Sequence, residues 1–180
     1  WQFAQYTREP SEIEAMIATY RAYNLAHHDA MVTAFPGTVE AVRSLKERGL
    51  ALAIVTSKLN AGARRGLACA GFDGLFDVIV GADDVDVHKP DPAPVLAALA
   101  RLGRQPETAV MVGDSPHDLA SGRAAGESAR RCAGRRRRGS SHCDPVHSNL
   151  PWLRSFDRPV HLTRASPVIL SGAKNLAAHF

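Results

Sequence analysis

The middle of this chain, residues 51–126, alternates between short apolar runs and segments of helical periodicity that end at a glycine. We expect strands over residues 51–55, 77–80 and 109–112, and helices over residues 61–70, 92–102 and 118–125. Strands that alternate with helices are joined by right-handed crossovers, which give a parallel sheet covered on both faces. The sequence therefore predicts an α/β fold with a Rossmann-like parallel sheet.

Two further helices are expected ahead of the first strand. One starts near Ser11 and carries apolar residues at helical spacing to about residue 26. The other opens at Pro36, which suits the first turn of a helix, and stops at Gly49. These helices come before the strands that bear the polar residues described next.

Polar residues follow each predicted strand, at the edge where parallel sheets bind ligands. They are Thr56, Ser57 and Lys58 after the first strand, Lys89 in the loop after the second, and Asp114 and Asp118 after the third. Carboxylate oxygens at such an edge are ligands that Mg²⁺ prefers. Each residue also has an ordinary interpretation, because carboxylates cap helices and Thr or Lys is common in loops.

The composition changes abruptly after Gly126. Residues 1–126 hold 12 Lys/Arg against 15 Asp/Glu, a net charge of −3, whereas residues 127–180 hold 10 against 3, a net charge of +7. The second part has an arginine run at residues 135–138 and scattered prolines, but no sustained periodicity that would offset the cost of ordering a backbone. We expect a poorly packed tail there, apart from a short strand at residues 167–170.

Other classes of protein find little support in the sequence. The three cysteines form no C-x-x-C pair, which argues against a disulfide framework, and Cys132, His142, Cys143 and His147 do not have zinc-finger spacing. No apolar run approaches the roughly 20 residues of a membrane helix, and the start lacks signal-peptide features. We therefore expect a cytoplasmic protein without membrane partners.

The strand-end residues resemble the motifs of the haloacid dehalogenase superfamily of hydrolases, in its phosphoglycolate phosphatase and pyrophosphatase branch. The resemblance covers residues 10–126. Val55-Thr56 is similar to the second motif, Lys89 to the third, and Gly113-Asp114 with Asp118 to the fourth. It implies a Rossmann-like core with a helical cap.

The resemblance also implies a role for each residue. Thr56 would hydrogen-bond a phosphate oxygen and Lys89 would neutralise its charge, while the Ser57-Lys58 pair would contact substrate. Asp114 would ligate Mg²⁺ directly, and Asp118 would support it directly or through water. The implied reaction is hydrolysis of a small phosphate ester, phosphoglycolate-like, or of pyrophosphate through an aspartyl-phosphate intermediate.

The chain departs from the family pattern at both ends. The first motif, DxDx(T/V), has no match before residue 10, so we expect a start inside the cap, with about 45 residues missing, and an inactive chain. We divide the sequence into a partial helical cap (1–34), a hydrolase core lacking its first strand (35–126), and a basic, disordered or frame-shifted tail (127–180). An alternative function is noncatalytic binding of nucleic acid or polyanions by the arginine run, although the run lacks interleaved aromatic residues for specific binding. The sequence does not predict an oligomeric state.

Overall fold

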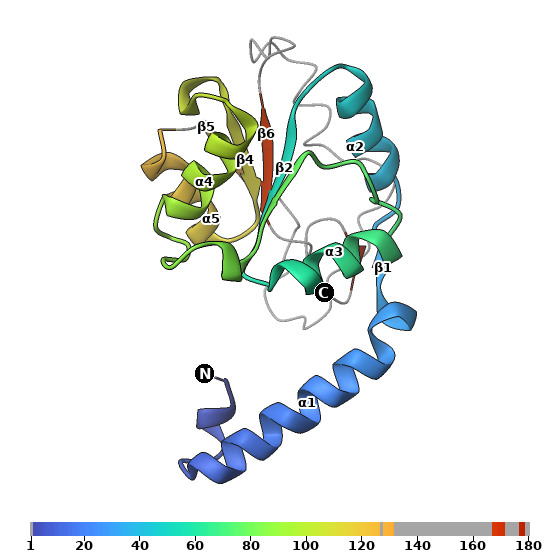
Figure 1. Cartoon of the computed structure of the whole chain (residues 1–180), viewed down its shortest axis with the longest axis vertical. Coiled ribbons are helices and arrows are strands. Elements are labelled where there is room, and N and C mark those ends of the chain that lie inside the picture. Colours follow the sequence, from blue (N-terminus) through green and yellow to red (C-terminus); the bar gives the residue numbers. More distant parts are fainter. Residues whose placement is uncertain (1, 127, 132–166, 172–176, 179–180) are drawn as a thin grey trace.

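The computed structural model describes residues 2–126, 128–131, 167–171 and 177–178 of the chain (Figure 1). Its α-helices are α1 (Pro10–Met31), α2 (Thr38–Glu47), α3 (Asn60–Cys69), α4 (Ala93–Leu102) and α5 (Pro116–Ala124). Its short 3-10 helices are η1 (Gln2–Gln5), η2 (Ala82–Asp84) and η3 (Pro106–Thr108). Its strands are β1 (Thr33–Ala34), β2 (Leu52–Val55), β3 (Val78–Val80), β4 (Val110–Gly113), β5 (Ser128–Arg131), β6 (Val168–Ser171) and β7 (Ala177–Ala178).

Five of these strands form one parallel sheet, in the order β3-β2-β6-β4-β5. The predicted α/β fold class is confirmed, and so are the strands and helices expected between residues 51 and 126. A separate antiparallel pair joins β1 to β7. Because β2, β3 and β4 all run in the same direction, the residues that follow them emerge at one edge of the sheet.

The central strand, β6, comes from the far C-terminal part of the chain. Leu170 pairs with Ile54 of β2 on one side and with Val112 of β4 on the other. The short strand expected at residues 167–170 is therefore present, but the boundary expected at Gly126 does not coincide with the end of the sheet. The expected tail structure otherwise falls mostly on residues 132–166, which lie outside the described residues.

The helices cover both faces of the sheet, α2 and α3 on one face and α4 and α5 on the other (Figure 1). Strand side chains alternate between the two resulting cores, as the period of two in a strand requires. Leu52 and Ile54 of β2 belong to the core beneath α2 and α3, while Ala53 and Val55 belong to the core beneath α4. Every side chain of β2 is fully buried, which fixes this strand rigidly under the polar segment that follows it.

Helix α1 extends away from the sheet (Figure 1). His28, near its C-terminal end, is its one buried residue. The helix is tied to α3 there, because the Arg65 guanidinium donates to both carboxylate oxygens of Asp29. No helix within the described residues is both long and apolar enough to cross a membrane.

Candidate active site

Four segments that the sequence singled out meet at the carboxyl edge of the sheet. Thr56 directly follows β2, and Asp114 directly follows β4. Lys89 lies in the loop between η2 and α4, and Asp118 lies in the first turn of α5. The predicted site residues therefore come from four different stretches of the chain, and parallel pairing of the strands brings these stretches to one edge.

Lys89 and Asp118 are in direct contact at this edge. The Lys89 Nζ atom donates to Oδ1 of Asp118 at 2.8 Å and to the carbonyl oxygen of Val55 at 3.1 Å. Both side chains are almost fully buried, with exposed fractions of 8% and 5%. Burial of either charge without a partner would be costly, so the contact between the two groups stabilises both buried side chains.

Asp118 is held in place by the N-terminus of its own helix. Ser115 is the N-cap of α5, and its hydroxyl accepts a hydrogen bond from the backbone N–H of His117 at 3.2 Å. In return, the backbone N–H of Ser115 donates to Oδ2 of Asp118 at 3.1 Å. The helix-cap interpretation of Asp118 is thus correct but incomplete, since its second oxygen faces Lys89. The Ser-x-x-Asp spacing of a capping box was the sequence signal for Ser115, a residue that we had not singled out.

Gly113 allows Asp118 to approach the end of β4. A Cβ atom at Gly113 would lie 2.5 Å from Cβ and 2.8 Å from Oδ2 of Asp118, closer than any ordinary contact. A glycine at the end of this strand is therefore a steric requirement of the Lys89–Asp118 pair. Asp114, one residue further on, is exposed, and its carboxylate makes no hydrogen bond or ion pair in the described structure.

Thr56 is the third buried polar group at this edge, with an exposed fraction of 7%. Its backbone N–H donates to the carbonyl of Val80 at 2.9 Å, and its hydroxyl oxygen accepts from the N–H of Lys58 at 3.2 Å. The hydroxyl proton remains available for donation, since that bond uses only the oxygen. Ser57 is exposed and Lys58 is half-buried on the same turn.

A second group of potential metal ligands lies between α1 and α3. One ligand atom from each of His28, Asp29 and Cys69 falls within 4.8 Å of the others. Both Asp29 oxygens are already bonded to Arg65, and the hydrogen bond to Asp29 raises the pKa of the Cys69 thiol. A protonated thiol and a carboxylate that already accepts from Arg65 are poor metal ligands. We therefore interpret this group as a set of polar contacts that connects α1 to α3.

Comparison with known proteins identifies the class to which this site belongs. The sequence profile of the family described as "Haloacid dehalogenase-like hydrolase" matches residues 1–129. The chain therefore belongs to the haloacid dehalogenase-like hydrolases, as its motifs had indicated.

Individual relatives agree with this assignment. "Pyrophosphatase PpaX" of Halalkalibacterium halodurans is 47% identical over 118 residues, which cover 66% of this chain and 55% of that protein. The crystal structure of "HAD phosphatase from Thermococcus onnurineus" superposes with a TM-score of 0.58 at 34% identity, over 69% of this chain and 58% of the other. A "predicted phosphoglycolate phosphatase" from Haemophilus somnus gives a TM-score of 0.51 at 32% identity, over 53% and 42%. The chain spans about half the length of the curated relatives that it matches.

Proposed function

We propose that this chain forms the phosphate- and cation-binding side of a phosphohydrolase site whose substrate is pyrophosphate or a small phosphate ester such as phosphoglycolate. The buried contact between Lys89 and Asp118, at the sheet edge where Thr56 follows β2 and Asp114 follows β4, is the observation that carries the proposal. A buried lysine at the carboxyl edge of the sheet would offer positive charge where a phosphoryl group gains negative charge during transfer.

The side chains fit this role individually. Lys89, which its bonds to Val55 and Asp118 hold at the end of β2, would place its positive charge close to one phosphate oxygen. Thr56 would donate its hydroxyl proton to a second oxygen. Ser57 and Lys58, on the turn above, would contact the remainder of the substrate.

Magnesium fits the carboxylates at this edge. Asp114 is exposed and uncommitted, so it would bind the ion directly, while Asp118, with both oxygens engaged, would support the ion from beneath, directly or through water. When bound, the ion would neutralise charge on the phosphoryl oxygens.

The nucleophile of the proposed reaction is the aspartate of the family's first motif. Its carboxylate would attack phosphorus, the leaving group would depart, and water would hydrolyse the aspartyl phosphate. This sequence has no match to that motif ahead of the second motif. We therefore expect the chain as it stands to bind pyrophosphate with magnesium but to release no phosphate above background.

Calorimetric titration of the chain with pyrophosphate in the presence of magnesium tests the proposal. Lys89→Ala should weaken binding about tenfold or more, because it removes a charge-assisted hydrogen bond. Lys46→Ala is the matched control, since Lys46 pairs with Asp77 near the first residue of β2, at the other end of that strand. Absence of pyrophosphate and phosphoglycolate binding, or equal binding by wild type and Lys89→Ala, would contradict the proposal.

The same titration distinguishes binding at the sheet-edge site from the alternative, in which the arginine run at residues 135–138 binds polyanions. Replacing Arg135 to Arg138 by alanine should leave magnesium-dependent binding intact if the sheet-edge site is the binding site. Binding that disappears in this variant, survives Lys89→Ala and weakens steeply with salt would instead identify the arginine run as the binding segment.

A further inference from the structure

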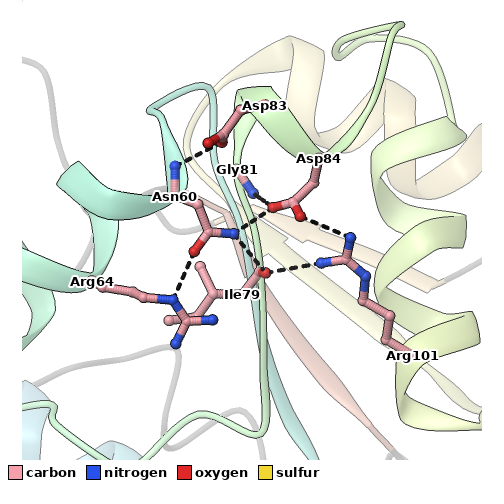
Figure 2. A network of polar contacts seen from close by, with 7 residues as sticks. All are labelled: Asn60, Arg64, Ile79, Gly81, Asp83, Asp84 and Arg101. Atoms are coloured by element: carbon pink, nitrogen blue, oxygen red, sulfur yellow. Dashed lines mark hydrogen bonds and ion pairs between the residues drawn. The ribbon is translucent and has the colours of Figure 1, made fainter.

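A network of polar contacts lies at the carboxyl end of β3, where the loop toward Lys89 begins (Figure 2). Asp84 is at its centre. Its Oδ2 atom accepts from the backbone N–H of Gly81 at 2.7 Å and from the side-chain amide of Asn60, and its Oδ1 atom accepts from Arg101 at 2.8 Å. We call Asn60, Gly81, Asp84 and Arg101 the Asn60–Asp84 junction. It joins the start of α3, the end of β3 and helix α4.

Backbone hydrogen bonds connect the junction to the turn that bears Thr56. The Thr56 N–H donates to the carbonyl of Val80 at 2.9 Å, and the Ala82 N–H donates to the carbonyl of Lys58 at 2.8 Å. The pairing of β2 with β3 thus continues beyond the sheet as far as the junction. The hydrogen bonds that hold the junction in place therefore also hold the Thr56 turn at a set distance from the loop that leads to Lys89.

The two sides of the junction are in van der Waals contact. A Cβ atom at Gly81 would lie 2.6 Å from the backbone nitrogen and 2.9 Å from Cα of Asn60. The hydrogen bonds from Arg101 and from the Gly81 N–H, with a further bond from Asn60, lower the pKa of Asp84 to about 2. Its carboxylate is therefore ionised at neutral pH and accepts on both oxygens at once.

We propose that Asp84 is a positioning residue for the site, holding the start of residues 85–88 so that Lys89 Nζ reaches the Val55 carbonyl and Asp118. Its importance for phosphate binding rests on the function proposed above. The position of Lys89 itself is measurable without any substrate, which keeps the two proposals separable.

Asp84→Asn is the informative substitution. It keeps the shape of the side chain but replaces one acceptor oxygen by an NH₂ group, which would then face the N–H donors of the junction. Asp86→Asn makes the same change of charge at an exposed position two residues away. Asp77→Asn removes a carboxylate that accepts from Lys46 and from the Leu52 N–H at the opposite end of β2, and so controls for general loss of stability.

Acetylation of lysines by an N-hydroxysuccinimide ester, followed by peptide mass spectrometry, reports the accessibility of Lys89 in the full chain. We expect Lys89 to react about tenfold or more faster in Asp84→Asn than in wild type, as loss of hydrogen bonds to a charged group implies. Asp86→Asn and Asp77→Asn should leave its rate unchanged. An unchanged rate in Asp84→Asn, or an equal rise in Asp77→Asn, overturns the positioning role. If Asp84→Asn does not fold, Arg101→Gln is the second variant. It removes the guanidinium that donates to Asp84 and to the Ile79 carbonyl, and should give a smaller rise in the same direction; no rise overturns the proposal.

Pyrophosphate titration completes the test. Asp84→Asn should raise the Kd for pyrophosphate with magnesium, and Asp84→Glu, which retains the charge, should restore part of the affinity. If Lys89 is acetylated faster in Asp84→Asn while the Kd for pyrophosphate is unchanged, the proposed effect of Asp84 on phosphate binding is overturned. A wild-type chain that does not bind pyrophosphate refutes the proposed function, while the acetylation rates still decide whether Asp84 positions Lys89.

Discussion

The Nζ atom of Lys89 lies 2.8 Å from Oδ1 of Asp118, and the two residues are 29 positions apart in the chain. Lys89 belongs to the loop after β3, whereas Asp118 belongs to the helix after β4. These two strands lie on opposite sides of the central strand, β6. The pair therefore ties the two halves of the sheet together across the edge at which we propose that phosphate binds.

Removing one partner of this pair should destabilise the protein strongly. Lys89→Met or Asp118→Asn is expected to lower the free energy of unfolding by about 3–5 kcal/mol, because the remaining charge stays buried without its partner. The double variant should lose less than the sum of the single losses, with a coupling of about 0.5–3 kcal/mol. Urea unfolding of the four proteins gives both quantities.

Asp114→Asn is the control for the comparison of the Lys89 and Asp118 single and double variants. Asp114 is exposed and unpaired in the described structure, so its substitution should change stability by no more than about 0.5 kcal/mol. Strictly additive losses for Lys89→Met and Asp118→Asn would show that the contact contributes no coupling energy.

Gly113→Ala should displace Asp118 even though it adds a single methyl group. The added Cβ would lie 2.5 Å from the Asp118 Cβ, and neither the strand end nor the first turn of α5 can give way without cost. We expect a loss of about 1–3 kcal/mol, the range for overpacking. Gly62→Ala is the matched substitution: it lies within α3 with open space around it, and should stabilise the protein by about 0.5–1 kcal/mol. Thermal or urea unfolding compares the two, and equal effects would contradict the steric explanation.

Much of the fold follows from local sequence signals. Apolar runs of strand length and helical segments closed by glycine predicted each α-helix and strand between residues 51 and 126, because these signals depend only on neighbouring residues, but they did not predict the short 3-10 helices η2 and η3. The carboxyl edge of the sheet then predicted where Thr56 and Lys89 would lie. Their residue types agreed with the family motifs.

The rest depends on contacts between distant segments. The apolar run at residues 167–170 predicts a strand, but its neighbouring residues do not indicate its partners. It pairs with β2 and β4, which both lie far earlier in the chain. Likewise, Asp84 has the sequence context of an ordinary loop residue. Its importance arises from Asn60 and Arg101, which only the folded chain brings to it.

Strand β6 should contribute to stability as a core strand. Leu170 is 2% exposed between β2 and β4, so Leu170→Ala is expected to cost about 2–5 kcal/mol through lost burial and the cavity that remains. Leu25→Ala makes the same change in α1, where the side chain is 62% exposed, and should cost less than about 1 kcal/mol. Urea unfolding measures both, and similar small losses for the two variants would show that β6 is not part of the cooperative core.

The contribution of the Arg65–Asp29 contact between α1 and α3 to the free energy of unfolding should depend on pH in the acid range. The hydrogen bonds from the Arg65 guanidinium, followed by that from His28, hold the pKa of Asp29 well below its ordinary value of 3.8. A carboxyl whose pKa is depressed by folding adds stability above its ordinary pKa and loses that contribution as the pH falls below it. The difference in unfolding free energy between wild type and Asp29→Asn should therefore be constant above about pH 5 and shrink below about pH 4. Urea unfolding from neutral to acid pH measures this difference, with Asp73→Asn, at an exposed position, as the control. A difference that grew on acidification would contradict the assigned role of Arg65.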